Sequence, residues 1–589
     1  MTKYITTIIL LSGILFSTTG TAATRKGDLL ITTFAPHNNN HSHGYVENRL
    51  QIQNLSLTKT HSIRLQAPSY TYSAYSDSIN SIERSVTIAP GTSLTTSLPV
   101  PALPVNGNNT VKIFIDGHDK GSFAMPSLNN SYRGYGGSTL SIMVSRTFNA
   151  QSIEDAIKTS GVYPKKSPGT PKIIYRTEEE INSWSRNWLG YSCYDAIILH
   201  RSDVETMPQT LQDTLHNYVS VGGVVVVAGT LDFPFNWPHT KHKTINNATK
   251  YICDFGCVIL LQADKIATLP KDELKIITQT AEKTLHPWNH SYSLSSANKL
   301  FPVMQNMTLP TRSMFAALLI FSIIIGPVLL IVLARKNRRI WLLWIAPAIS
   351  FVVCVIITIY SIMSEGITPF CRIASLSILN QNTHHCSTIG MLSIYCPLTP
   401  SGGLHFKNHT EISHFLNTGY SSRGTGRYIN WTHDQNLSQG WVTARVPSIF
   451  QVRIPEMRRE RIEFSTKDGK PFIVNGLGAS ITKLWLCDAD GNYFCYNKKV
   501  KPGAKIKLEP APAPPKTKHT TRDIYTSEPW TKTLTKKLSS NEISNLLKPN
   551  MYLAILDDSP FITSGLKGRI HKNNKAFVIG ILPNHNGDR

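Results

Sequence analysis

Two long uncharged segments restrict the possible folds of this chain more than any other feature. Residues 314–334 and 340–363 contain no charged side chain, and each reaches the roughly 20 residues that a helix needs to cross a bilayer. The loop between them is basic, and short basic loops favour the cytoplasmic side of a membrane. The pattern predicts transmembrane helices at residues 313–334 and 340–363, with both flanking regions outside the cytoplasm. The predicted cytoplasmic loop, residues 335–339, holds four cations: Arg335, Lys336, Arg338 and Arg339.

The N-terminus has the features of an export signal, which agrees with this topology. Lys3 precedes an apolar run at residues 5–16, and small residues follow at positions 21–23. A charged start, a short apolar run and a small-residue cleavage site are typical of a secretory signal peptide, here residues 1–23. An uncleaved N-terminal anchor is the alternative, because two basic residues come directly after the site.

The cysteines suggest disulfides, because an even number of them lies in the region that is expected to be exported. The chain has nine cysteines, of which only Cys354 falls within an apolar run. Even numbers of cysteines in exported proteins commonly form a disulfide framework. The candidate pairs are Cys487 with Cys495 across a predicted turn, Cys253 with Cys257 in a CDFGC loop, and Cys386 with Cys396, which leaves Cys193 and Cys371 as a fourth pair or free.

Residues 24–133 consist of short runs in which apolar and polar residues alternate, such as DLLITTF and NTVKIFIDG, separated by Pro, Gly, Asn and Ser. Alternation with period two between turn residues predicts a β-sandwich of immunoglobulin-like type. His37, His41 and His43 lie together in HNNNHSHG. No carboxylate or cysteine ligand accompanies them, so we expect a solvated loop and no metal site.

Residues 134–265 alternate apolar strands with helical segments. Strands are predicted in STLSIMVSR, PKIIYR, YDAIILH and VVVVAG. Between the last two, Leu211, Leu215, Tyr218 and Val219 recur at helical spacing, and a glycine pair ends the helix. Such alternation implies a parallel sheet that is covered by helices on both faces.

The stretch YDAIILHRSDVETMPQTLQDTLHNYVSVGGVVVVAGT, preceded by Trp184 and Trp188, resembles the flavodoxin-like, class I glutamine-amidotransferase-like domain of many membrane-anchored bacterial envelope proteins. The resemblance covers about residues 137–261. Glutamine amidotransferases of this class carry a cysteine on a strand-to-helix elbow flanked by glycines, because the thiolate must be exposed and activated. No such elbow occurs in this chain, so the resemblance implies a catalytically silent domain.

Three residues of this domain are weak candidates for catalysis. His200 and Asp203 follow the end of a predicted strand, where open α/β sheets usually bind ligands. Cys193 precedes the same strand. A helix-capping or loop role for Asp203 is the favoured alternative.

The remainder is expected to be a connector at residues 266–312 and, after the apolar segments, a β-sandwich-like domain at residues 364–508. A proline-rich linker at residues 509–518 leads to a C-terminal α+β portion at residues 519–589. The prediction for the whole chain is a multidomain α/β plus all-β protein: an N-terminal β-sandwich, a flavodoxin-like α/β domain, a transmembrane helical hairpin and a C-terminal β-rich domain. This order resembles two-helix bacterial envelope membrane proteins.

The net charge of +23 is concentrated in the last third of the chain, where 29 Lys and Arg face 15 Asp and Glu after Ile367. No nucleic-acid recognition motif accompanies the charge, so DNA and RNA are not expected partners. A solvated basic surface is the simplest interpretation. Contact with anionic envelope polymers or lipid headgroups is the alternative.

Together these features predict a two-pass protein of the bacterial inner (cytoplasmic) membrane that binds or assembles with other envelope proteins outside the cytoplasm, without cofactor and without enzymatic activity. One alternative is an envelope hydrolase or transferase with a degenerate site. Another is an accessory subunit of an ABC-type exporter, which would need a separate ATPase because the chain has no GxxxxGK[ST] phosphate-binding loop.

Overall fold

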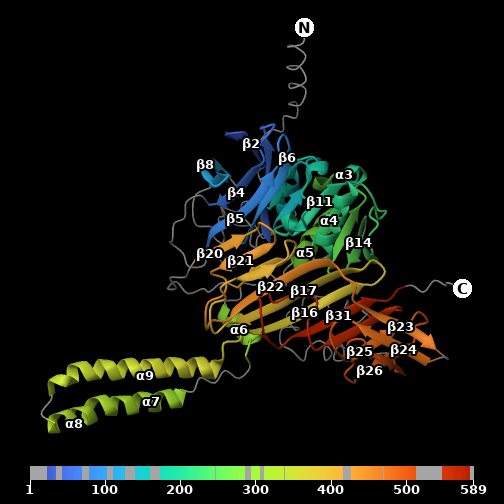
Figure 1. Cartoon of the computed structure of the whole chain (residues 1–589). Helices are drawn as coiled ribbons and strands as arrows, with labels where there is room; N and C mark the ends of the chain where they lie inside the picture. Colours follow the sequence, from blue (N-terminus) through green and yellow to red (C-terminus); the bar gives the residue numbers. More distant parts are fainter. Residues whose placement is uncertain are drawn as a thin grey trace.

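The computed structural model describes residues 23–34, 43–68, 78–102, 110–125, 140–159, 173–245, 247–285, 294–304, 311–336, 339–415, 426–467, 470–512 and 547–583. These residues form a mixed α/β and β-rich body, from which a pair of apolar helical rods extends (Figure 1). The predicted signal peptide before Ala23, His37, His41, Arg338 and most of the proline-rich linker lie outside the described residues.

The N-terminal strands form two sheets that share one apolar core, as the alternating sequence predicts. The first sheet contains β1 (Ala23–Lys26), β2 (Leu29–Phe34), β3 (Tyr45–Asn54) and β6 (Ser93–Pro101). The second contains β4 (His61–Ala67), β5 (Ile79–Ile88), β7 (Thr110–Ile115) and β8 (His118–Ala124). Every second residue is buried, for example Leu29 and Ile31 in β2 and Ile63 and Leu65 in β4. We call this pair of sheets the N-terminal sandwich.

The N-terminal sandwich is not confined to residues 24–133, which corrects the predicted domain boundary. Strand β20 (Arg427–Asn430) pairs in parallel with β5, and β21 (Gln435–Gln439) and β18 (Leu404–Phe406) extend the same sheet. These strands follow the apolar helices in the chain. They cover the edge of β5, whose backbone groups would otherwise be unpaired along that side.

Residues 140–285 form an α/β domain with a sheet of the predicted parallel type. Its strands are β9 (Ile142–Val144), β10 (Ile174–Arg176), β11 (Ala196–His200), β12 (Val224–Ala228), β13 (Thr240–Ile245), β14 (Ala248–Cys253) and β15 (Gly256–Leu261). The spatial order is β10-β9-β11-β12-β15-β14-β13, with β14 and β13 antiparallel. When the strands are numbered by their order in the sequence, the spatial order of the first four is 2-1-3-4, which begins a common doubly wound arrangement.

Helices cover both faces of this sheet. They are α2 (Ala150–Thr159), α3 (Arg201–Thr206), α4 (Gln209–Ser220), α5 (Lys271–Leu285) and the short 3₁₀ turns η2 (Ile181–Ser183), η3 (Trp188–Tyr191) and η4 (Ile266–Thr268). The predicted α4 core residues are all buried, with Leu211 and Leu215 in the same core as the N-terminal sandwich. Ile153 of α2 and Leu274 of α5 belong to a separate core on the other face.

A ten-stranded sheet, here the large sheet, forms the other half of the body. Its strands are β16 (Phe370–Asn380), β17 (His385–Tyr395), β19 (Glu411–His414), β22 (Ser448–Met457), β25 (Ile481–Cys487), β26 (Tyr493–Tyr496), β28 (Glu509–Pro510), β29 (Met551–Leu556), β30 (His571–Lys572) and β31 (Lys575–Ile581). The predicted separate C-terminal portion is therefore wrong, because β29 and β31 lie between β16 and β25 in the middle of this sheet. A small sheet of β23 (Arg461–Lys467), β24 (Lys470–Gly476) and β27 (Lys505–Lys507) packs beside it.

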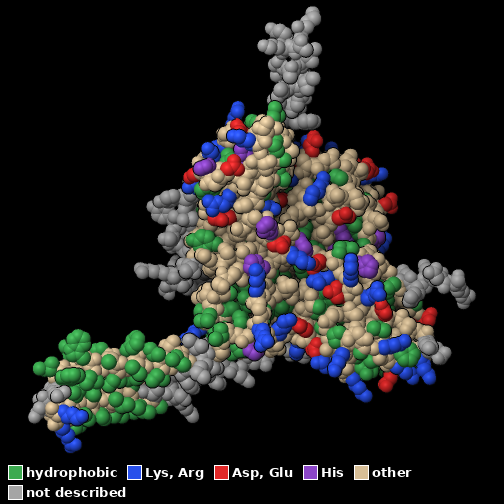
Figure 2. All heavy atoms as spheres, in the orientation of Figure 1, with side chains coloured by type: hydrophobic (Ala, Val, Ile, Leu, Met, Phe, Trp, Pro, Cys, Tyr) green, Lys and Arg blue, Asp and Glu red, His purple; other side chains and the backbone are tan. Residues whose placement is uncertain are grey.

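The apolar segments form helices that lie side by side and extend away from the body, with their apolar side chains on the outside (Figures 1 and 2). After α6 (Leu294–Leu300), the first rod comprises α7 (Thr311–Ile323), the π-helical turn η5 (Ile324–Val328) and α8 (Leu329–Arg335); the second comprises η6 (Arg339–Trp341) and α9 (Leu342–Glu365). Among the described residues, one helix, Leu318–Arg335, is long and apolar enough to cross a membrane, and α9 contains a shorter apolar stretch, Leu343–Ile359. The two-pass topology stays a prediction.

No disulfide joins the nine cysteines, all of which are described. Residues 253 and 257 point to opposite faces of their sheet, because Cys257 lies opposite Ile252 and Cys253 opposite Gly256. Cys386 and Cys396 lie near the two ends of β17, roughly 30 Å apart for a strand of this length. These two predicted pairings are therefore wrong for this fold.

The remaining predicted pair lies on neighbouring strands of the large sheet. Cys487 of β25 pairs with Tyr493, and Cys495 of β26 pairs with Trp485, so the cysteines are offset by two residues. No bond joins their sulfurs. Cys487 is buried, and its burial raises the pKa of the thiol.

Candidate functional site

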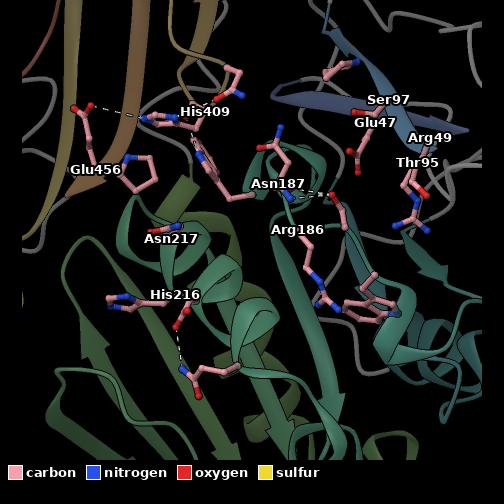
Figure 3. Close-up of a pocket in the computed structure, with 18 of the residues that line it drawn as sticks. Glu47, Arg49, Thr95, Ser97, Arg186, Asn187, His216, Asn217, His409 and Glu456 are labelled. Carbon is pink, nitrogen blue, oxygen red and sulfur yellow. Dashed lines mark hydrogen bonds and ion pairs between the residues drawn. The ribbon is translucent and has the colours of Figure 1, made fainter. Parts of the chain in front are cut away.

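A cavity of about 1310 Å³ opens where the N-terminal sandwich, the α/β domain and the large sheet meet (Figure 3). Its walls come from β3 and β6, from residues 182–188 before β11, from α4, and from residues 236–238 after β12. Residues 383–385, 408–409 and 455–457 of the region after the apolar helices complete it. We call it the junction cavity. Ligand sites occur preferentially at such junctions between domains.

The N-terminal sandwich is fixed to the α/β domain by the segment that begins at His43. The His43 ring bonds to the Ser192 carbonyl through Nδ1 and to Asp195 through Nε2, both at 3.0 Å. Each ring nitrogen thus contacts an oxygen of the α/β domain. Asp195 is fully buried and also accepts from the Ser141 amide. The prediction of a solvated loop is wrong for His43, because its side chain is buried against a carboxylate far away in the sequence.

Tyr45 forms hydrogen bonds with residues from all three parts of the body. Its amide donates to Ser192 Oγ at 2.8 Å, and its hydroxyl donates to the Ile412 carbonyl at 2.9 Å. Gln435 donates to the same hydroxyl at 2.6 Å. Burial raises the pKa of Tyr45. The hydroxyl therefore stays protonated and can donate at this three-way contact.

A buried ion pair within the large sheet lies against the α/β domain. Arg453 of β22 donates through Nε to Glu411 of β19 at 2.9 Å, and both side chains are almost fully buried. The guanidinium also reaches the Val221 carbonyl at 3.4 Å and lies 5.8 Å from the Trp188 ring. The Trp188 indole in turn donates to the His409 carbonyl at 2.8 Å.

One wall of the cavity is made of uncharged polar groups around the end of α4. His216 and His385 have their ring centres 4.6 Å apart, and His385 Nε2 bonds to Asn217 Oδ1 at 3.0 Å. Burial, and secondly the neighbouring His385, lowers the pKa of His216 to about 4, so this imidazole is neutral at physiological pH. Trp237 stacks on Phe235 with ring centres 4.0 Å apart.

Two of the charged groups that line the cavity form ion pairs with residues outside the lining. Arg49 forms an ion pair with Glu179. Glu456 contacts Lys407 and, at 2.7 Å, Arg458. Arg49 and Glu456 lie on opposite sides of the view in Figure 3.

His200 and Asp203 lie together at the carboxyl end of β11, where they begin a helix. Asp203 accepts from the His200 amide at 2.9 Å, and the His200 ring accepts from the Ser202 amide, which forms a reciprocal cap on α3. Asp203 also accepts from the hydroxyls of Ser145 (2.6 Å) and Thr147 (2.9 Å). The carboxylate is thus occupied by capping contacts.

Cys193 does not lie beside His200 and Asp203. It precedes β11 while His200 ends it, so the strand separates them by roughly 16 Å or more. Cys193 is 2% exposed, and burial raises the pKa of its thiol, which disfavours the reactive thiolate. The three candidates therefore do not form one catalytic site.

The predicted basic loop lies at the far tip of the two rods, where Figure 2 shows cations next to the apolar surface. Arg335 ends α8, Lys336 follows it, and Arg339 begins η6. These residues lie at the ends of the rods that are farthest from the body (Figure 1).

The residues of the junction cavity were missed by the sequence analysis, because they come from many separate segments and share no motif. A high frequency of Trp between residues 182 and 237, at Trp184, Trp188 and Trp237, is the one signal that could have indicated them. The chain matches no protein-family model and no curated protein.

Proposed function

We propose that this chain is a membrane-anchored binding protein of the bacterial cell envelope, whose extracytoplasmic body holds a polar ligand in the junction cavity. The observation that carries the proposal is the cavity itself, which is large, is lined by both polar and apolar groups, and lies at a three-way junction held by buried contacts such as those of Tyr45 with Ser192 and Ile412. Such preformed sites with convergent polar groups favour ligand binding.

Binding without catalysis is supported by the state of the candidate nucleophile and acid–base groups. The strand order of the α/β domain is consistent with the flavodoxin-like, amidotransferase-like resemblance. A nucleophile of that class must be exposed and activated, whereas Cys193 is buried with a raised pKa and Asp203 caps a helix. We propose that the domain is a catalytically silent wall of the binding site.

Anchoring by two membrane helices is supported by the exposed apolar rods and by the cations at their tip. Leu319 is 60% exposed and Trp344 is 76% exposed, which is costly in water and favourable in lipid. Four cations within residues 335–339 favour a cytoplasmic tip. The body would then lie on the opposite side of the inner membrane.

The topology is tested by alkaline phosphatase fused after residue 304, after Lys336 and after Gly366, because this enzyme is active only outside the cytoplasm. We expect high activity for the first and third fusions and at least about tenfold lower activity for the second. The fusions are compared at equal amounts of protein in the membrane fraction. Equal activity at all three positions would contradict a two-pass anchor.

The binding function is tested by blocking the cavity. Asn236 is exposed and lines the cavity, so Asn236→Trp fills space without removing a core contact. We expect wild-type protein purified from native membranes to release at least one small molecule on denaturation, detected by mass spectrometry, and Asn236→Trp to release at least about tenfold less of it. Asn573→Trp, at an exposed asparagine between β30 and β31, is the matched control. Identical release by all three proteins would refute the binding function.

A further inference from the structure

We infer that the ligand of the junction cavity is an uncharged oligosaccharide. This inference rests on the proposed binding function and adds the chemical class of the ligand. Three properties of the cavity carry it: its charges are balanced, neutral hydrogen-bonding groups line it, and the edge of strand β6 along it is closed to a peptide.

The charge of the cavity lining is balanced. Three arginines and three carboxylates contribute to it: Arg49, Arg84, Arg186, Glu47, Asp213 and Glu456. Arg49 is neutralised by Glu179, and Glu456 by Lys407 and Arg458. Arg84 faces the charge of Glu47 and donates to the Ser97 carbonyl at 2.7 Å. A site that selects an anion or a cation would hold an excess of the opposite charge, which this lining does not offer.

Neutral hydrogen-bonding groups also line the cavity. Trp237 is 6% exposed, and its indole Nε1 has no hydrogen-bond partner among the described residues. Next to it stands the neutral ring of His216, with ring centres 5.3 Å apart. Asn182 and Asn236 add exposed amides that can both donate and accept. Sugar hydroxyls match such groups because each also donates and accepts.

A peptide that adds a strand to the sheet is disfavoured by the cavity edge of β6. This strand ends its sheet, and Thr95, Ser97 and Pro99 line the cavity. The Ser97 carbonyl is occupied by Arg84 and the Pro99 carbonyl by the Trp431 indole at 3.1 Å. Proline also has no amide hydrogen to donate. The main-chain hydrogen bonds that an added strand requires are therefore blocked at these positions of the edge.

The ligand class is tested on the full-length chain purified in detergent, by isothermal titration with five probes. These are chitohexaose, cellohexaose and maltohexaose as neutral sugars, hexagalacturonate as an acidic sugar, and hexa-alanine as a peptide. We expect at least one neutral hexasaccharide to bind at least tenfold more tightly than hexagalacturonate and hexa-alanine. Trp237→Phe should weaken that binding about tenfold, the usual effect of losing one buried hydrogen bond to a ligand.

Trp485→Phe is the matched control, since the Trp485 indole nitrogen is also buried and without a hydrogen-bond partner among the described residues but lies on β25, outside the lining. It should leave the affinity unchanged. Tighter binding of hexagalacturonate or hexa-alanine than of the neutral sugars would overturn the sugar class and leave the binding function in place. The same conclusion would follow if none of the five probes bound while the purified protein still released a natural ligand. Equal affinities of Trp237→Phe and wild type would overturn the assigned contact.

Discussion

Replacing Gly44 by alanine is expected to lower the free energy of unfolding by about 3 to 5 kcal/mol and to detach the N-terminal sandwich from the α/β domain. Gly44 has a φ of +68°, which costs an L-residue about 1 kcal/mol or more. An added Cβ would lie 2.2 Å from the Ser192 carbonyl oxygen and 2.6 Å from the Cys193 amide nitrogen. The backbone of Ser192 and Cys193 cannot yield locally, so a further overpacking cost of about 2 to 3 kcal/mol follows. Urea denaturation of the purified protein measures the change.

Gly91→Ala separates the steric effect from the backbone effect. Gly91 has nearly the same φ, +65°, but a Cβ there would meet nothing within 4 Å. We expect a loss of only about 1 to 2 kcal/mol for this variant. Limited proteolysis should cut Gly44→Ala between the sandwich and the α/β domain while leaving Gly91→Ala as resistant as wild type. Equal stabilities of the two variants would show that the docked segment does not contribute to the junction.

Arg453→Ala is expected to destabilise the protein by about 3 to 5 kcal/mol, because it leaves Glu411 buried without its partner. The double variant Arg453→Met with Glu411→Leu removes both charges and should regain most of the loss, since apolar replacement of a buried ion pair is often close to neutral. The same urea titration applies. A double variant as unstable as the single one would indicate that the contact with the Val221 carbonyl, and not the buried charge, dominates.

Arg461→Ala is the control for this prediction. Arg461 pairs with Glu463 on the small sheet, and both side chains are more than half exposed. Exposed pairs contribute at most about 1 kcal/mol, so this variant should be within that range of wild type. A loss comparable to that of Arg453→Ala would contradict the assignment of the effect to burial.

Local patterns in the sequence predicted local structure well. The spacing of Leu211, Leu215 and Tyr218 located α4, and alternation located the strands of the N-terminal sandwich. Asp203 at the start of α3 has the capping role that its position favoured. These features depend on neighbours within a few residues, which the sequence displays directly.

Long-range partners were not predictable in the same way. Alternation shows that β20 and β31 are strands but not that they pair with β5 and β16. His43 and Asp195 carry no pattern that connects them across the chain. Cysteines close in sequence suggested bonds, whereas the pleat turns Cys253 and Cys257 to opposite faces. The junction cavity depends on such long-range contacts, which explains why no site residue was found beforehand.

The pairing of β5 with β20, and of β16 with β31, has a consequence for biosynthesis. Under the proposed topology, the first 300 residues leave the ribosome and cross the membrane before the strand that covers β5 exists, so its open edge is exposed to other chains during export. The large sheet cannot close until β31, near the last described residue, has also been delivered. Under the same topology, insertion of the two rods falls between the two halves of one folding reaction, and a chaperone outside the cytoplasm would have to shield the incomplete N-terminal half from other chains.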